Sequence, residues 1–424
     1  MTGTISINGV SDDVPTSSID AVKGVSGADI SFIPDAGLPL HSRICFEGDS
    51  ITKGSNGPTF IEFALMRSLG RFYAPIGYNE AVGGETAAQM ASTTETAQVN
   101  ATKPKVVVLL AGTNDLGETS DTVQTIFRNI RICIGAYLAV GAHVVNVCVL
   151  PRIDPVFKAR GAQREADRLA LNDMIRAQTD VTVVDVESQF DPTRMTITNS
   201  AKDTGLHPNY LGAIVVGNAV GDALNSLVTT DTPIAHSFDP QSLMLVADNP
   251  QLNGTQGALS NGATGVVADQ WTLDMTAGSG LRVVGSKSTL NGRNAQRIVV
   301  SGTNAHAGPA SVTFRNNVNF PGAAAGDLYD VWWDFVLKAT KNLGLIAATA
   351  GTTVSMPIPS IPANTLIPNN ESLSGVIRIP SVATLAAPVT AINMQIVLTF
   401  PAGADCAADI ALASPYLAKV PAGR

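Results

Sequence analysis

Ser50 lies in a loop shortly after a predicted strand and carries a hydroxyl that could act as a nucleophile. The apolar run 44–46 leads through Glu47 into Gly48-Asp49-Ser50 and then into a turn-rich segment at residues 53–58. In open α/β sheets, ligands bind at the carboxyl ends of the strands. A serine at that edge can attack a carbonyl if other segments supply a base and hydrogen-bond donors for the oxyanion. Alone, the tripeptide is also ordinary turn sequence, because turns favour these three residue types.

Two later segments carry groups that can donate hydrogen bonds. Gly83 and Gly84 precede a helical pattern, and adjacent glycines in a tight loop leave a backbone N–H accessible. Asn114 belongs to the segment Gly112–Asp115, which follows the most apolar strand of the chain, residues 105–111, so we expect it at the same sheet edge as Ser50. Its side-chain amide could donate to a developing oxyanion. Taken singly, each segment also fits a simple connecting turn.

His207 is the candidate base. The first 231 residues contain three histidines. His41 precedes the first predicted strand, and His143 begins a strand, which places it at the edge opposite Ser50. His207 stands on a loop before the last helix of this half and can enter the site. By elimination, His207 is the residue that we expect to accept the serine proton.

Helical and strand patterns alternate between residues 42 and 228. Continuous apolar runs indicate strands that are buried on both faces, and apolar residues at helical spacing indicate amphipathic helices. Thr59 is the expected N-cap of the first long helix. This alternation predicts a parallel sheet covered by helices on both sides. The predicted strands are 43–46, 105–111, 143–150 and 181–186, and the predicted helices are 59–69, 123–140, 162–178 and 210–228.

The composition changes near residues 229–240. Glu371 is the one glutamate after residue 231, and short apolar runs separated by turn residues replace the helical patterns. We therefore predict an antiparallel β-sandwich of jelly-roll type. The predicted organisation is an N-terminal arm or linker (1–38), an α/β domain (39–230) and an accessory β-sandwich (231–424). The predicted strands of the sandwich are 271–275, 281–285, 297–300, 310–314, 328–338, 353–358, 375–379 and 391–400.

The composition also disfavours several classes of function. The net charge is −8, whereas nucleic-acid binding requires basic surfaces. There is no apolar stretch of about 18 residues, so membrane insertion is not expected. The amino terminus lacks the features of a signal peptide. The four cysteines show no metal-type spacing and fall in apolar patterns, which predicts buried free thiols, and neither a disulfide framework nor a zinc site is expected.

Four segments in this order resemble the SGNH (GDSL) hydrolase family, over residues 40–228. The resemblance implies a flavodoxin-like three-layer α/β/α fold and hydrolysis of an ester through a serine. No metal and no cofactor is implied. The segments are Gly48-Asp49-Ser50, Asn79-Glu80-Ala81-Val82-Gly83-Gly84-Glu85-Thr86, Gly112-Thr113-Asn114-Asp115 and Leu206-His207-Pro208-Asn209.

The resemblance also implies a role for each matching residue. Ser50 is the nucleophile, and its own backbone N–H donates to the oxyanion, with Asp49 as a supporting neighbour. Gly84 supplies a second backbone N–H, and the Asn114 side chain supplies a third donor. His207 takes the proton of Ser50 and later returns one to the leaving alcohol.

One position departs from the family pattern. Members usually carry an aspartate three residues before the histidine, where this chain has Thr204. Asp203 lies one residue earlier and could reach the histidine ring through a one-residue bulge, which would complete a triad. Alternatively, Thr204 or a backbone carbonyl orients His207, and the enzyme works as a Ser-His dyad.

The residues that would contact substrate are less well marked. Arg152 could approach the site from a loop, or it could be an ordinary surface cation. Trp332 and Trp333 are neighbours on a predicted strand and so should face opposite sides. One of them could stack on a sugar ring or in a subunit contact, or both could be structural. The chain has no long apolar lid, so we expect short acyl esters rather than long-chain lipids.

The whole chain resembles a polysaccharide O-deacetylase with an accessory sandwich. Its Gly-, Thr- and Asn-rich texture is also similar to that of phage tail-fibre proteins, which are commonly trimers. The expected partners are an acylated polysaccharide and, in a virion, other tail proteins. A virion or extracellular location and a bacterial exported or cytoplasmic esterase are both compatible with the sequence. The alternative to an enzyme is a glycan-binding or structural virion protein that retains the hydrolase domain as a scaffold.

Overall fold

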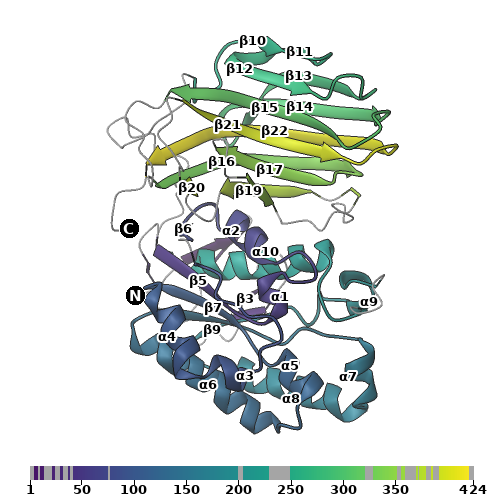
Figure 1. Cartoon of the computed structure of the whole chain (residues 1–424). Helices are drawn as coiled ribbons and strands as arrows, with labels where there is room; N and C mark the ends of the chain where they lie inside the picture. The colour runs from purple at the N-terminus through teal and green to yellow at the C-terminus, as the bar shows by residue number, and fades with distance from the viewer. Residues whose placement is uncertain are drawn as a thin grey trace.

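The computed structural model describes two layered units built from most of the chain (Figure 1). The predicted boundary at residues 229–240 lies outside the described residues, and so does Asp203. The described residues are 4–7, 10–13, 22–23, 29–31, 37–38, 42–74, 77–198, 204–228, 249–319, 328–350, 355–358, 369–370, 372–378, 383–384 and 391–419.

The first unit contains a seven-stranded sheet in the order β3-β4-β9-β8-β7-β5-β6. Strands β6, β5, β7, β8 and β9 are parallel and follow the flavodoxin-like order 2-1-3-4-5. This confirms the predicted fold class. The bounds are β3 Val22–Lys23, β4 Asp29–Ser31, β5 Ser42–Gly48, β6 Phe72–Tyr73, β7 Val106–Leu110, β8 His143–Val147 and β9 Thr182–Asp185.

Helices cover both faces of this sheet, as the alternating patterns predicted. Alternate residues of β7 enter different cores: Val106 and Val108 pack on the side of α2 and α10, whereas Val107 and Leu109 pack on the side of α6 and α8. Both faces of β7 are therefore buried, which explains its continuous apolar run. The helices are α1 Ser50–Lys53, α2 Ile61–Arg67, α3 Ala87–Met90, α4 Thr93–Ala101, α5 Thr113–Glu118, α6 Val123–Ala139, α7 Pro155–Ala159, α8 Ala162–Arg176, α9 Pro192–Met195 and α10 Tyr210–Ser226.

Part of the predicted N-terminal arm is ordered as strands. Strand β4 pairs antiparallel with β9 at the edge of the sheet, and β3 pairs with β4. A separate hairpin joins β1 Thr4–Ile7 to β2 Val10–Asp13. The segment predicted as an N-terminal arm or linker therefore contains short paired strands. Strands of two to four residues are too short to show a strand pattern in the sequence, and β4 is defined by its pairing with β9.

The second unit is a sandwich of two sheets that follows the jelly-roll order. One sheet contains β14-β22-β16-β19 and the other contains β15-β21-β17-β18, with further strands added at the edges. In each sheet a strand from the end of the chain separates two earlier strands, as in the paired Greek keys of a jelly roll. This confirms the predicted jelly-roll architecture. The bounds are β10 Gln256–Leu259, β11 Thr264–Gly265, β12 Val267–Met275, β13 Arg282–Leu290, β14 Arg293–Thr303, β15 Ala310–Asn319, β16 Leu328–Lys341, β17 Leu345–Ala350, β18 Ser355–Ile358, β19 Leu373–Arg378, β20 Ala383–Thr384, β21 Ala391–Phe400 and β22 Asp405–Lys419.

Trp333 lies in the core of the sandwich. Its ring makes an edge contact with Trp271 at 5.2 Å between centroids, and Trp271 stacks on Phe314 at 4.7 Å. Trp333 is fully buried, so it cannot stack on a sugar, and its expected role in substrate binding was wrong. The side chain of Trp332 lies outside what the structure describes.

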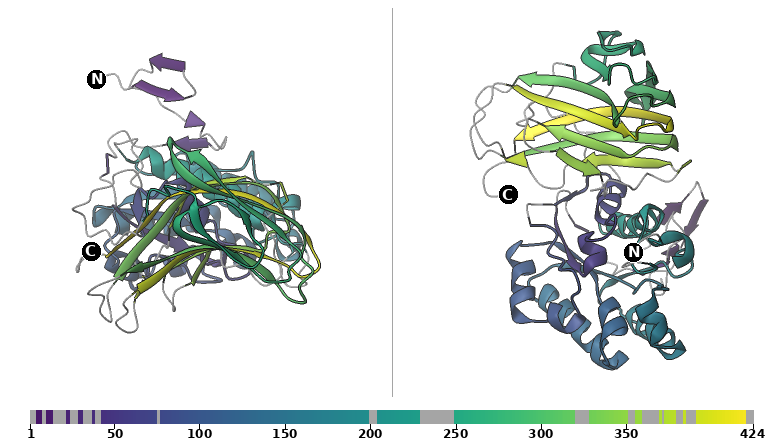
Figure 2. Two further views of the ribbon diagram at one scale, coloured as in Figure 1. Left: turned by 90° about the horizontal axis from the view of Figure 1, so that it is seen from above. Right: turned by 45° about the vertical axis from the view of Figure 1, so that its right-hand side comes forward.

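The sandwich packs directly on α2 and α10 (Figures 1 and 2). Phe63 and Met66 of α2 and Tyr210 of α10 belong to the same apolar core as the sandwich strands. Gly375 of β19 touches the backbone of α2, where an added Cβ would lie 2.2 Å from the carbonyl oxygen of Met66. The two units therefore share a continuous core, and the sandwich occupies the outer face of the α2 and α10 layer.

All four cysteines are buried free thiols, as predicted. Within the described residues, no cluster of three or more His, Cys, Asp or Glu side chains is arranged to hold a metal ion. None of the described helices combines the length and the apolar character needed to cross a membrane.

Candidate active site

Ser50 is the first residue of α1, at the carboxyl end of β5. The side chain of Asp49 caps this helix by accepting a hydrogen bond from Ile51 N at 2.9 Å. Gly48 is needed for close approach, because a Cβ there would lie 2.3 Å from Thr52 Oγ1. Strand β5 stands between β6 and β7, which is the point where the strand order of a flavodoxin-like sheet reverses and where ligands bind.

Asp49 is fully buried beneath Ser50. Burial raises the pKa of its carboxyl to about 6, although the hydrogen bond from Ile51 and the charges of His207 and Arg152 oppose the shift. The carboxyl accepts the capping hydrogen bond from Ile51 N and does not face solvent. This agrees with a supporting function for Asp49 in fixing the Ser50 backbone.

His207 meets Ser50 across the site. The distance from His207 Nε2 to Ser50 Oγ is 2.7 Å, and His207 is buried, with 5% of the residue exposed. The loop is held by its main chain: Ile197 N donates to His207 O at 2.9 Å, and Asn209 N donates to Met195 O at 2.9 Å. Asn209 also caps α10, so the histidine is fixed between two anchored points. The structure thus brings together the two residues that were predicted as nucleophile and base.

The group that orients the histidine ring stays a prediction. Asp203 lies outside the described residues, so the structure does not test the triad. Thr204 is exposed at the start of the described loop. The alternatives of a triad through Asp203 and a Ser-His dyad both remain open at this point.

The loop with Gly83 and Gly84 lies against Ser50. Val82 N donates to Gly48 O at 3.0 Å, which joins this loop to the end of β5. A Cβ on Gly83 would lie 3.8 Å from the Cβ of Ser50, whereas the corresponding position on Gly84 is open and its φ is +84°. Gly84 therefore sits in a left-handed conformation at an uncrowded place beside the serine.

Asn114 is bound to the same loop. Its Nδ2 donates to the main-chain carbonyl of Glu85 at 2.7 Å, and the side chain is buried. The adjacent Asp115 accepts a hydrogen bond from Ala87 N at 2.8 Å through Oδ2. Two consecutive residues after β7 thus clamp the segment that contains Gly84. Sequence reasoning identified Asn114 but not the hydrogen bond from Ala87 N to Asp115. The one sequence signal for Asp115 was its position next to Asn114 in the segment Gly112–Asp115.

Arg152 is neither a surface cation nor a substrate contact. Its side chain is 4% exposed and forms an ion pair with Asp154, at 2.6 Å between Nε and Oδ2. Its Nη1 donates to the carbonyl of Thr113 at 2.7 Å, and its guanidinium lies over the ring of Phe157. The expectation failed because a loop position in the sequence does not reveal which carbonyls a long side chain can reach.

Two buried glutamates lie beside the site. Glu47 of β5 is fully buried, and burial together with the negative charges of Glu85, Glu95 and Glu80 raises its pKa to about 9. Burial, followed by the charges of Glu95 and Asp49, raises the pKa of Glu85 to about 7. Sequence reasoning did not identify either side chain as buried, because a glutamate in a strand or in a loop gives no local signal of burial.

Residues 46–213 match the model of the GDSL-like lipase/acylhydrolase family. Ser50, Gly84, Asn114 and His207 all lie within this segment. This segment belongs to that family. We refer to this segment as the GDSL-like domain, and its Ser50 and His207 are in hydrogen-bond contact. No curated protein matches the chain.

Several solved structures are similar to the GDSL-like domain. A family 3 carbohydrate esterase from Talaromyces cellulolyticus is 22% identical, with 44% of this chain and 97% of that chain covered and a TM-score of 0.36. A catalytic mutant of an acetylxylan esterase from Geobacillus stearothermophilus is 16% identical, with 46% and 99% covered and a TM-score of 0.35. A family 3 carbohydrate esterase from Clostridium thermocellum is 22% identical, with 44% and 98% covered and a TM-score of 0.33.

Proposed function

We propose that the protein is a serine esterase that removes short acyl groups, O-acetyl above all, from a polysaccharide. The observation that carries this proposal is the 2.7 Å contact between Ser50 Oγ and His207 Nε2 at the carboxyl edge of the sheet. A serine hydroxyl is a weak nucleophile until a neighbouring base accepts its proton. The contact provides such a base within hydrogen-bond distance.

The reaction follows from this pair. Ser50 Oγ attacks the ester carbonyl while His207 Nε2 takes the hydroxyl proton. The tetrahedral intermediate collapses, the bond to the sugar oxygen breaks, and His207 returns the proton to that oxygen. Water then attacks the acyl-serine with His207 as base, and the carboxylic acid leaves with Ser50 restored.

Three donors are assigned to the oxyanion. They are the backbone N–H of Ser50, the backbone N–H of Gly84 and the side-chain amide of Asn114. An amide nitrogen carries two N–H bonds, and one of those on Asn114 is directed to Glu85 O. The other is the donor that we assign to the oxyanion. Because these donors are fixed before substrate binds, they stabilise the developing charge without reorganisation.

We assign the orientation of the His207 ring to Asp203. In serine hydrolases an aspartate that accepts from Nδ1–H selects the productive tautomer and stabilises the imidazolium. If Asp203 has this role, Asp203→Ala lowers kcat strongly, whereas Thr204→Ala has little effect. A near-normal rate in Asp203→Ala would instead establish the Ser-His dyad.

The surroundings of Ser50 support a short acyl group. Gly83 packs against the serine, and Lys53, Ser55 and Asn56 form the polar rim of the adjoining turn. Val82 is the one large hydrophobic residue that is exposed in the described loops 50–57, 82–86, 112–115 and 204–209. An aliphatic chain would therefore find little apolar surface, whereas an acetyl group on a hydrated sugar requires none.

The test is release of acid from esters of increasing acyl length. We expect turnover of p-nitrophenyl acetate to exceed that of the octanoate ester. We also expect acetate release from acetylated polysaccharides, and Ser50→Ala should abolish both activities. Equal turnover by wild type and Ser50→Ala would reject the proposal and favour the glycan-binding or structural alternative.

A further inference from the structure

Arg152 contacts the backbone of the segment that carries Asn114. Its Nη1 donates to Thr113 O at 2.7 Å, and Thr113 directly precedes Asn114. The guanidinium also lies against Gly117, where an added Cβ would stand 2.7 Å from Nη1. Arg152 therefore contacts both ends of α5, at the carbonyl of Thr113 and at Gly117. These two contacts restrain the position of this short helix.

The guanidinium is itself held in a fixed orientation. Asp154 accepts from Nε at 2.6 Å and also caps α7 by accepting from Phe157 N. Burial raises the pKa of Asp154, but the hydrogen bond and charge of Arg152 outweigh burial, so the pKa lies below its ordinary value. The pair is therefore ionised, and a planar guanidinium with one nitrogen on Asp154 presents another in a defined direction to Thr113.

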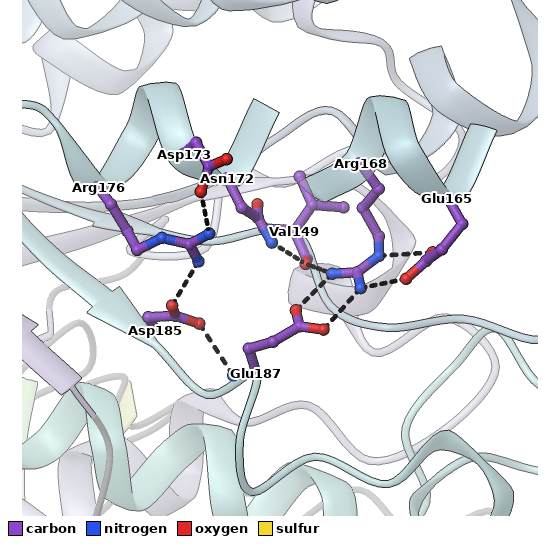
Figure 3. Close-up of polar contacts among 8 residues, drawn as sticks. All are labelled: Val149, Glu165, Arg168, Asn172, Asp173, Arg176, Asp185 and Glu187. Carbon is purple, nitrogen blue, oxygen red and sulfur yellow. Dashed lines mark hydrogen bonds and ion pairs between the residues drawn. The ribbon is translucent and has the colours of Figure 1, made fainter. Parts of the chain in front are cut away.

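The segment between β8 and Arg152 is also held at Val149, whose contacts Figure 3 shows. Val149 N donates to Asn172 Oδ1 at 2.8 Å, and Val149 O accepts from both Asn172 and Arg168. Arg168 is fully buried and is bound in turn by Glu165 and Glu187. Helix α8 thus fixes the chain three residues before Arg152 and supplies a rigid base for its side chain.

Ile153, the residue after Arg152, contacts the loop that carries the base His207. Ile153 N donates to Gly205 O at 2.8 Å, two residues before His207. Gly205 has a φ of +91°, and a Cβ there would lie 2.6 Å from the Ile153 side chain, so this approach requires glycine. Residues 152 and 153 therefore contact both the donor segment and the base loop.

We infer that Arg152 is a positioning residue for the oxyanion hole, holding Asn114 in place through the carbonyl of Thr113. This inference rests on the proposed esterase function. Arg152 touches neither Ser50 nor His207 in the contacts described, so its effect on rate passes through Asn114. Since a misplacement of about 1 Å can lower a rate about 10²-fold, loss of this contact should reduce kcat by roughly 10- to 100-fold. KM should change little, because the interaction is made in the transition state.

Two variants test this by different routes. Arg152→Met removes the hydrogen bond, but it also leaves Asp154 buried without its partner and can destabilise the fold. Gly117→Ala leaves all charges in place and displaces only the end of the Arg152 side chain. We expect both variants to lower kcat toward p-nitrophenyl acetate with nearly unchanged KM. Arg152→Lys should not restore the rate, since an ammonium cannot reproduce the planar two-nitrogen contact.

Arg160→Met is the matched control. Arg160 donates to Gly117 O at 3.1 Å and to Thr119 O at 3.3 Å, at the far end of α5 from Asn114. It should leave kcat within about twofold of wild type, because it makes no contact with the first turn of the helix.

A double-mutant cycle with Asn114→Ala decides whether Arg152 acts through Asn114. We expect Gly117→Ala and Arg152→Met to lower kcat much less in the Asn114→Ala background than in wild type. Undiminished effects in that background, unchanged kcat in Gly117→Ala, or a change confined to KM would overturn the inference. Turnover that survives Ser50→Ala would instead reject the proposed function itself, so the two failures are distinguishable.

Discussion

Asn114 and Glu85 are joined by one hydrogen bond of 2.7 Å, from the side-chain Nδ2 of the first to the main-chain carbonyl of the second. With the neighbouring bond from Ala87 N to Asp115, it ties the end of β7 to the loop beside Ser50. Two of the three assigned oxyanion donors, on Gly84 and Asn114, therefore belong to one connected piece of structure. A change in one of them should disturb the other.

Asn114→Ala should lower kcat by about 10²–10³-fold, which is the usual loss when one oxyanion donor is removed. We expect a loss at the upper end of this range, because the variant also frees the Glu85 carbonyl that fixes the Gly84 loop. Steady-state kinetics on p-nitrophenyl acetate measure it. Asn225→Ala is the control, since Asn225 also donates to a backbone carbonyl, that of Arg67, but lies away from the site. Similar losses in both variants would point to a general effect on folding.

His207→Ala should lower kcat by several orders of magnitude, up to about 10⁶-fold as in serine proteases whose base is removed. The reason is that Ser50 then lacks a proton acceptor at 2.7 Å. His143→Ala provides the control, because His143 begins β8 at the opposite edge of the sheet. Comparable activity of wild type and His207→Ala would remove His207 from the mechanism.

Glu47→Gln should stabilise the protein at alkaline pH. Burial and the neighbouring carboxylates raise the pKa of Glu47 in the folded state to about 9, whereas the unfolded chain has the ordinary value of 4.5. Between these values the folded state binds more protons, so stability falls as pH rises through this window. The variant has no carboxyl to ionise, and its advantage should grow with pH and level off above about pH 9. Each pKa unit corresponds to about 1.4 kcal/mol, so the gain should be readily measurable.

The measurement is thermal or urea unfolding of wild type and Glu47→Gln from pH 7 to pH 10. This range is chosen because Glu85, with a pKa near 7, contributes a similar slope at lower pH. The exposed Glu118 offers a control, and Glu118→Gln should leave the slope unchanged. Parallel curves for wild type and Glu47→Gln would show that Glu47 is not the group responsible.

Gly375→Ala should destabilise the contact between the two units. Its Cβ would meet the Met66 carbonyl at 2.2 Å, and the φ of +141° disfavours any side chain. Overpacking of this kind typically costs about 1–3 kcal/mol. Differential scanning calorimetry should show a lower Tm. Gly403→Ala separates the two causes, since Gly403 also has a positive φ but its Cβ would meet nothing within 4 Å. An equal loss of Tm in both variants would assign the effect to the backbone alone.

The last strand shows why part of the fold escaped sequence analysis. Strand β22, Asp405–Lys419, lies between β14 and β16, yet its alanines, its aspartates and Pro415 all disfavour a strand. Pro415 falls in the register shift between the pairs Trp332–Tyr416 and Asp334–Ala413. A bulge is one of the few places where a sheet tolerates proline. Only the partners on both sides make this segment a strand.

The α/β half was predictable because its signals are local. Buried parallel strands appear as continuous apolar runs, and chain direction alone then places Ser50 and Asn114 at the same edge. His207 followed from elimination among three histidines, and the order of four short segments indicated the family.

By itself, the sequence determined the parallel sheet, the jelly-roll sandwich and the residue types of the site, because apolar periodicity and segment order are local properties of the sequence. Tertiary structure alone decided that Arg152 is buried on Thr113, that Trp333 is a core residue and that the sandwich shares its core with α2 and α10. These outcomes depend on which distant surfaces meet. A side chain of given type can lie at a surface, in a core or beneath a loop, and only its three-dimensional neighbours select among them.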